Sequence, residues 1–204
     1  MSVDTNKQGM IYASFDAEWL NTPSPFQQLD NDWIKIIIFY VFHIPVSGIS
    51  ARGGSLSAYQ WGEMSKKNDF KLLKKKLIFD AQIKDKHFRC VEKKEEMEKA
   101  LTENDLINFP SNITAQRITF KKHKSGMNES LLSHIRNSFA HGRLAFYMEG
   151  GETYVAMEDI GSQGLVTARM ILSKSTLMKW KQTIENGPYI ARAVINNDKK
   201  EIKS

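Results

Sequence analysis

The chain lacks the residues and motifs that mark disulfide-rich, zinc-binding and other metal-dependent proteins. Cys90 is the single cysteine among 204 residues, which excludes an intrachain disulfide and is typical of a protein in a reducing compartment. The sequence has no His-Glu-x-x-His, Cys-x-x-Cys or paired-carboxylate motif. His134 and His141 would lie about 10 Å apart along a helix, too far to share one ion. We therefore expect neither a bound metal nor a cofactor.

The sequence also shows no pattern typical of a targeting or membrane-spanning segment. Residues 1–4 are polar, unlike the start of a signal peptide. The most apolar stretch, residues 33–46, is interrupted by Lys35, His43 and Pro45 and is too short to cross a bilayer. We expect a soluble, cytoplasmic protein without a membrane partner.

Basic residues are in excess, with 29 Lys and Arg against 23 Asp and Glu, a formal charge of +6 and a pI near 9.3. This excess favours a polyanionic partner such as RNA, although an anionic membrane surface would suit it too. A chain of 204 residues with 41% hydrophobic residues can bury one good core. We expect a single domain over residues 1–204, with mobile tails at 1–10 and 196–204.

Apolar periodicity predicts helices over most of the chain. Asp30 or Asn31 can cap a helix that we expect to lie inside a bundle. Its periodic apolar residues are Trp33, Ile34, Ile37, Ile38, Val41 and Phe42. Residues 56–101 are charged and helix-prone, and their lysines fit either a solvated helix face or an RNA-binding surface. Ser173 can cap a last helix, which Gly187-Pro188 would stop.

In one region, apolar residues occur at every second position, as is typical of β-strands. Leu144, Phe146 and Met148 alternate up to Gly150-Gly151, and residues 154–157 continue beyond that turn, which predicts a tight hairpin. Residues 165–172 can add a third strand. The predicted fold class is therefore mainly α, a helical bundle with a β-hairpin or three-stranded β appendage over residues 144–172.

The segment Arg-Asn-Ser-Phe-Ala-His-Gly-Arg, residues 136–143, carries the most informative chemistry. It ends a run in which apolar residues share one arc of a helix. These apolar residues are Leu131, Leu132, Ile135 and Phe139. Arg136 and His141 fall roughly 140° apart around that helix, so a phosphate can lie between them. Gly142 can stop the helix and leave His141 beside its last carbonyls, where the helix dipole favours imidazolium.

This segment resembles the R-x4-H signature of HEPN-superfamily proteins, in the form with Asn after the Arg and Gly after the His. Arg136, Asn137, His141 and Gly142 match it, and the resemblance extends over roughly residues 127–185, including the hairpin after the motif helix. It implies a small, mostly helical domain that dimerises and cuts RNA without a metal. In that family the Arg and His of both protomers meet at the dimer interface.

The resemblance also suggests a role for each residue. Arg136 would hold the phosphate, His141 would transfer the proton, and Asn137 would orient one of them or bind the phosphate. We expect further substrate contacts from Lys121, Lys122, Lys124, His134 and Arg143. The structural alternative is that Arg136 pairs with a carboxylate and His141 only caps the helix.

The predicted function is a metal-independent endoribonuclease that uses the 2′-OH of RNA as its nucleophile. By family analogy it would be a toxin or antiphage effector, active as a homodimer and restrained by an antitoxin or regulatory partner. The alternatives are a non-catalytic RNA- or nucleotide-binding module and a structural protein whose basic surface recruits another chain.

Overall fold

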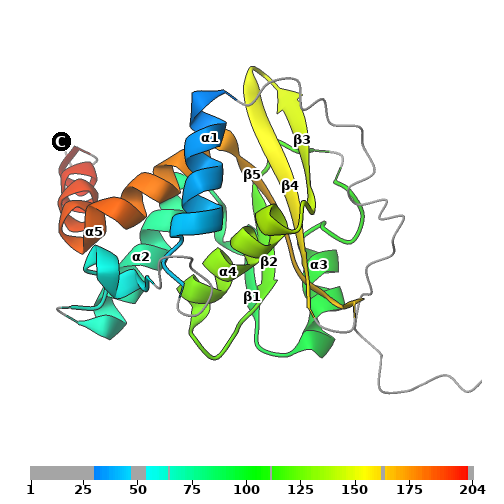
Figure 1. The fold of residues 1–204 in the computed structure, drawn as a ribbon, viewed down its shortest axis with the longest axis horizontal. Coiled ribbons are helices and arrows are strands. Elements are labelled where there is room, and N and C mark those ends of the chain that lie inside the picture. The colour runs from blue at the N-terminus through cyan, green and yellow to red at the C-terminus, as the bar shows by residue number, and fades with distance from the viewer. Residues whose placement is uncertain (1–29, 47–53, 64, 111, 162–163, 202–204) are drawn as a thin grey trace, which may run out of the picture.

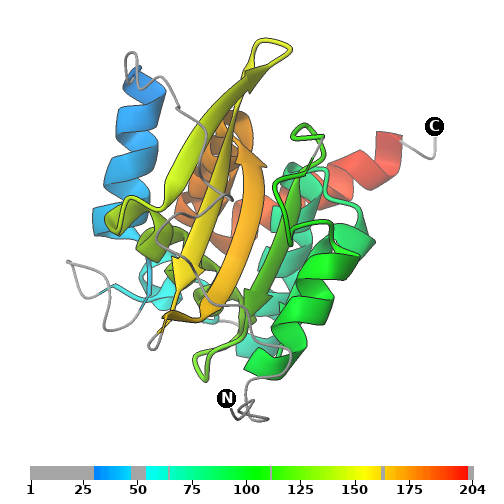
Figure 2. The ribbon, with the colours of Figure 1, turned by 90° about the vertical axis from the view of Figure 1, so that its right-hand side faces the viewer.

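A five-stranded mixed sheet forms the centre of the molecule (Figures 1 and 2). The computed structural model describes residues 30–46, 54–63, 65–110, 112–161 and 164–201, the last eight of them by backbone alone. The strands are β1 (Phe88–Val91), β2 (Arg117–Lys121), β3 (Leu144–Glu149), β4 (Glu152–Ile160) and β5 (Val166–Ser173). Their spatial order is β1-β2-β5-β4-β3, with β1 and β2 parallel and all other neighbours antiparallel.

The fold is therefore α/β, and the predicted mainly-α bundle with a small β appendage is wrong. β1 lies within residues 56–101, for which the sequence predicts helix. β2 ends at Lys121, the first of the lysines that the sequence predicts to contact RNA. β1 has only four residues, too few to show a period of two against its charged neighbours. β2 is buried on both faces, because Ile118 and Phe120 meet the helical layer while Arg117 and Thr119 face the other side.

The two faces of the sheet have separate apolar clusters. The larger lies under α1 (Asn31–Ile37), α2 (Lys66–Asp80), α4 (Met127–Ala140) and α5 (Lys174–Glu201). The smaller lies under α3 (Met97–Glu103), where Met97 and Leu101 pack against Ala156 and Ile171. Short single-turn helices occur at Leu56–Tyr59, Asp85–His87 and Lys94–Glu96. Thus residues 56–101, expected to be helical, contain two α-helices separated by a strand.

The predicted hairpin is confirmed. β3 and β4 pair from Leu144 opposite Met157 to Glu149 opposite Glu152. Gly150 and Gly151 form the turn with φ of +58° and +79°, as a two-residue hairpin with both central residues in the left-handed region requires. β5 adds the expected third strand beside β4.

The first helix begins where the sequence predicts but buries a different face. Asp30 caps α1 by accepting hydrogen bonds from the backbone N–H groups of Asp32 (3.1 Å) and Trp33 (2.9 Å). The helix continues as a π-helix, η2 (Ile38–His43). Its core residues are Trp33, Ile36, Phe39 and Tyr40, while Ile34, Ile38 and Phe42 are 45%, 43% and 50% exposed. The expectation that this helix lies inside a bundle is wrong, because it flanks the helical layer with one apolar face partly exposed.

The last helix is longer than expected. Ser173 caps α5 by accepting a hydrogen bond from the backbone N–H of Thr176 (3.1 Å). Gly187 has φ of +73° and kinks the helix, but the chain continues as helix from Pro188 to Glu201. The glycine therefore bends the helix and does not end it, and the expected tail at 196–204 is helical in backbone up to Glu201. The expected tail at 1–10 lies outside the described residues. None of the described helices is both long and apolar enough to cross a membrane.

Candidate functional site

The motif lies at the carboxyl end of α4, which packs on the sheet beside β2 and β4. Leu131, Leu132 and Ile135 are buried in the main core, which confirms the predicted apolar face. The predicted glycine stop is confirmed as well. Gly142 has φ of +64°, its N–H donates to the carbonyl of Phe139 (3.2 Å), and the N–H of Arg143 donates to that of Ser138 (2.9 Å). This double closure is the Schellman motif, and it fixes His141 as the C-cap residue.

Four side chains form a chain of contacts from the surface into the core. Arg136 Nη1 donates to Asn137 Oδ1 (3.2 Å), and Asn137 Nδ2 donates to Asp159 Oδ2 (3.3 Å). The same Asp159 oxygen lies 2.6 Å from His134 Nδ1 and accepts from Thr167 Oγ1 (3.2 Å). The structure thus joins Arg136 and Asn137 to two residues of the interior, His134 on α4 and Asp159 on β4.

His134 is completely buried, and acceptors face both of its ring nitrogens. Nε2 lies 2.8 Å from the carbonyl oxygen of Lys121, a group that can only accept, so Nε2 carries a proton. Nδ1 faces the Asp159 carboxylate, which also accepts when ionised, so the doubly protonated ring satisfies both contacts. Burial raises the pKa of Asp159, but the hydrogen bond and charge of His134, together with hydrogen bonds from Asn137 and Thr167, outweigh burial and leave the pKa below its ordinary value. His134 therefore positions other groups and does not reach a substrate from its buried location.

Arg136 keeps an uncompensated charge. Among the described residues no Asp or Glu side chain forms an ion pair with it, and its Nε is buried without an acceptor. The guanidinium is only half-buried. Of the structural alternative, the pairing of Arg136 with a carboxylate is thus not found among the described residues, whereas His141 does occupy the C-cap position. A cation held by an amide remains available for an anionic ligand.

His141 is exposed at the end of the same helix. Its backbone N–H donates to the carbonyl of Asn137 (2.9 Å), and its ring has no hydrogen bond to another of the described residues. Its ring lies at the carboxyl end of α4, where it is accessible to a bound molecule. Within one protomer, Arg136 and Asn137 are brought together, whereas His141 is separate from both side chains.

The remaining predicted substrate residues differ in their surroundings. Lys124 is exposed, whereas Lys121 is half-buried and gives its carbonyl to His134. Lys122 pairs with Glu92 (2.7 Å). Arg143 pairs with Glu158 (2.7 Å), a fully buried acid that also binds Arg169 (3.0 Å). Of this set, Lys124 is the cation most open to a ligand.

Asp159 and His123 belong to the site but were not predicted from the sequence. Asp159 follows Glu158 directly after the apolar residues 155–157 of β4, and two acids in the buried part of a strand are a signal that each needs a partner. The His123 ring centroid lies 4.5 Å from that of His134. Burial lowers the pKa of His123, and the nearby charges of His134 and Lys121 lower it further against the opposing charge of Asp159.

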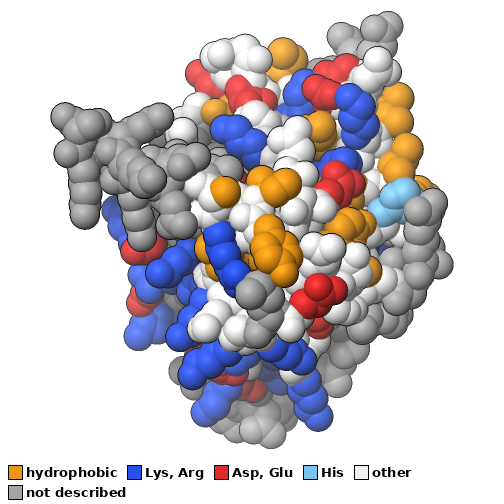
Figure 3. All heavy atoms as spheres, turned by 90° about the vertical axis from the view of Figure 1, so that its left-hand side faces the viewer, with side chains coloured by type: hydrophobic (Ala, Val, Ile, Leu, Met, Phe, Trp, Pro, Cys, Tyr) orange, Lys and Arg blue, Asp and Glu red, His pale blue; other side chains and the backbone are white. Residues whose placement is uncertain are grey.

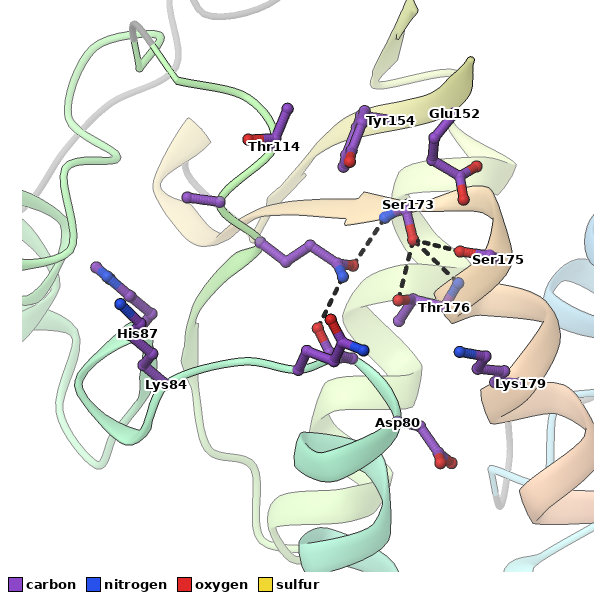
Figure 4. A pocket seen from close by; sticks show the side chains of 14 residues that line it. Asp80, Lys84, His87, Thr114, Glu152, Tyr154, Ser173, Ser175, Thr176 and Lys179 are labelled. Atoms are coloured by element: carbon purple, nitrogen blue, oxygen red, sulfur yellow. Dashed lines mark hydrogen bonds between the residues drawn. The ribbon is translucent and has the colours of Figure 1, made fainter. Parts of the chain in front are cut away.

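A separate polar hollow of about 340 Å³ lies between the end of α2 and the start of α5 (Figure 4). Gln116 bridges its two sides, since Oε1 accepts from the Ser173 N–H (2.8 Å) and Nε2 donates to the Ala81 carbonyl (2.7 Å). Its lining carries charges of both signs, namely Asp80, Lys84, Glu152 and Lys179. None of the motif residues lines it, and its mixed charge selects no class of ligand.

Among the described residues, no three His, Cys, Asp or Glu side chains come together in a way that could hold a metal ion. Comparison of the chain with models of protein families, with curated proteins and with solved structures finds no match.

Proposed function

We propose that the chain is a metal-independent endoribonuclease whose active groups are Arg136, Asn137 and His141. The observation that carries the proposal is the unpaired guanidinium of Arg136, held by Asn137 on the helix that presents an exposed His141 at its end. The support is local to α4, because the α/β fold differs from the helical bundle that the HEPN resemblance implies. The resemblance of the motif and the excess of basic residues are consistent with RNA as the substrate.

The chemistry requires few groups because RNA carries its own nucleophile. The 2′-oxygen forms a bond to phosphorus as its proton leaves to a base, and the bond from phosphorus to the 5′-oxygen breaks as that oxygen is protonated. The products are a 2′,3′-cyclic phosphate and a 5′-hydroxyl. Arg136 would stabilise the charge that develops on the phosphate oxygens, His141 would move one of the protons, and Asn137 would orient Arg136.

The proposed active form is a homodimer. A single α4 places Arg136 and His141 roughly 140° apart, so one protomer does not supply a cation, an acid and a base to one phosphate. Tyr40 of η2 stacks on Phe139 of α4, with ring centroids 6.1 Å apart. Because η2 continues α1, the exposed side chains of Ile34 and Ile38 lie on a helix that is packed beside α4. A second copy related by a two-fold axis can bury these two side chains. A toxic activity of this kind would need an antitoxin or regulatory partner.

The test is incubation of the full chain with total RNA in the presence and absence of EDTA, followed by mapping of the RNA ends. We expect cleavage despite the chelator, and His141→Ala should reduce the rate by roughly 10²–10⁴-fold because a positioned acid or base is removed. Mixing Arg136→Ala protein with His141→Ala protein should restore part of the activity if the site is shared. Binding without cleavage would instead identify a non-catalytic RNA-binding module.

A further inference from the structure

We infer that the basic face of α2, together with a hollow at the start of α4, binds the phosphate backbone of the RNA on its way to Arg136. This inference rests on the proposed function for the identity of the polyanion. The surface is distinct from the motif residues and from Lys121, Lys122 and Lys124. Figure 3 views the side of the molecule that carries α2 and α5, and Lys and Arg side chains gather over its lower part.

Three lysines of α2 align on one side of the helix. Lys67, Lys71 and Lys74 follow each other at intervals of four and three residues, so they fall within about 60° around the axis. Lys67 and Lys71 are exposed, and no described acid forms an ion pair with any of the three. Lys74 Nζ lies 5.4 Å from the centre of the Phe88 ring, an interaction that leaves its positive charge intact. The stripe therefore carries a charge of +3.

The acids of the same helix are engaged elsewhere. Asp69 is buried and pairs with Arg192, and Asp80 pairs with the buried Lys76 and accepts from Thr183 (2.7 Å). They therefore do not neutralise the exposed stripe. Charge of a single sign on one face of a helix is the arrangement expected for attraction of a polyanion.

The stripe borders a hollow of about 140 Å³ against the first turn of α4. Its wall from α2 consists of Lys67, Phe70, Lys71 and Lys74, and the opposite wall of residues 125–129. Glu129 is the one carboxylate among the described residues that line it. Burial raises the pKa of Glu129, although Lys66 nearby opposes this shift. Leu56, Phe70 and Met127 also line the hollow, so the phosphates would be held by the lysines that border it. A flexible strand can follow this concave surface more closely than the flat face of a membrane can.

The hollow is aligned with the motif. Arg136 follows Glu129 by seven residues, close to two helical turns, and so lies on the same side of α4 about 10 Å further along. At an axial rise of about 3.4 Å per nucleotide in a stacked strand, this separation corresponds to roughly three nucleotides. A single strand that binds the lysines can thus continue to the guanidinium.

The test compares two triple variants in which the same amount of charge is removed. One is Lys67→Gln, Lys71→Gln, Lys74→Gln, and the control is Lys93→Gln, Lys94→Gln, Lys99→Gln near α3 on the opposite face of the sheet. Binding of a 20-nucleotide oligouridylate is measured against salt in a His141→Ala background, and cleavage is measured in the wild-type background. We expect the first variant to lower the slope of log affinity against log salt by about 2, or roughly 0.7 for each phosphate that is no longer neutralised. Saturated turnover should not change, and Glu129→Gln should tighten binding.

The outcomes separate this inference from the proposed function. If wild-type protein cuts RNA and both triple variants have the same salt slope, α2 does not bind the RNA, and the proposed cleavage activity is still supported. If wild-type protein binds RNA without cutting it and only the α2 variant binds more weakly, RNA binding by α2 is supported and the proposed catalytic activity is contradicted. Binding to phosphatidylserine vesicles but not to the oligonucleotide, abolished in the α2 variant, would overturn the assignment to RNA in favour of a membrane.

Discussion

Two histidines of the same helix, seven residues apart, differ in almost every physical respect. His134 is fully buried, with one ring nitrogen 2.6 Å from a carboxylate oxygen and the other 2.8 Å from a carbonyl oxygen. His141 is exposed, and its hydrogen bonding is that of its backbone. A histidine with both ring nitrogens in hydrogen bonds orients its neighbours, whereas a histidine with an accessible ring can reach a substrate.

The buried histidine supports the site to which the exposed one belongs. His134 and Asp159 form a charged pair in the interior, and this pair holds Asn137, which in turn holds Arg136. Replacement of a buried charged pair by apolar residues often costs little stability, so such a pair alone is weak evidence for a stabilising role. Its connection to an unpaired surface cation is a better reason for its presence here.

The largest expected effect is on stability. His134→Ala leaves the Asp159 carboxylate buried without its cationic partner, and breaking such a pair costs about 3–5 kcal/mol. Urea denaturation measures this destabilisation, with His141→Ala as the matched substitution on the same helix. We expect the free energy of unfolding of His141→Ala to change by less than about 0.5 kcal/mol. Equal destabilisation of the two variants would remove the distinction between a structural and a reactive histidine.

The second largest effect is on the rate of RNA cleavage. It tests whether Asn137 connects the buried pair of His134 and Asp159 to Arg136. Asn137→Asp places a carboxylate beside Arg136 and opposite Asp159, so it offers the guanidinium an ion-pair partner in place of the phosphate. We expect the rate of RNA cleavage to fall roughly 10²-fold, the scale of one missing electrostatic interaction in a transition state. Asn137→Ala removes the hydrogen bond without adding charge, so its rate should fall less. An Asp variant more active than the Ala variant would show that Arg136 does not act as a free cation.

The sequence predicts the parts of this molecule that depend on neighbours along the chain. The α4 helix, its stop at Gly142, the Gly150-Gly151 turn and the Ser173 cap all follow from side chains within a few positions of each other. Such local signals do not need a partner from a distant segment.

The features that the sequence does not predict depend on partners distant along the chain. β1 pairs with β2 across thirty positions, as in Phe88 opposite Ile118. Asp159 is twenty-five residues from His134 and is brought to it only when β4 packs under α4. In α1 the apolar residues extend around the helix, so periodicity alone does not decide which face is buried. His123 is unassigned from sequence for the same reason, because its neighbour His134 is recognised only in the folded chain.

The smallest expected effect concerns His123 and mild acid. The pKa of His123 in the folded protein lies below its ordinary value of 6.5 because burial, His134 and Lys121 all disfavour its protonation, with Asp159 alone opposing them. The unfolded chain therefore binds a proton more readily than the folded one as pH falls below about 6.5, and stability decreases there.

His123→Gln should make the melting temperature less sensitive to pH between about 7.5 and 5.5. Asp159 does not contribute in this window, since its lowered pKa keeps it ionised throughout. His141→Gln is the control for the substitution itself, made at an exposed position, and His123→Gln should reduce the sensitivity to pH by more than this control does. A His123 variant with the wild-type dependence on pH would show that protonation at this position is as easy in the folded chain as in the unfolded one.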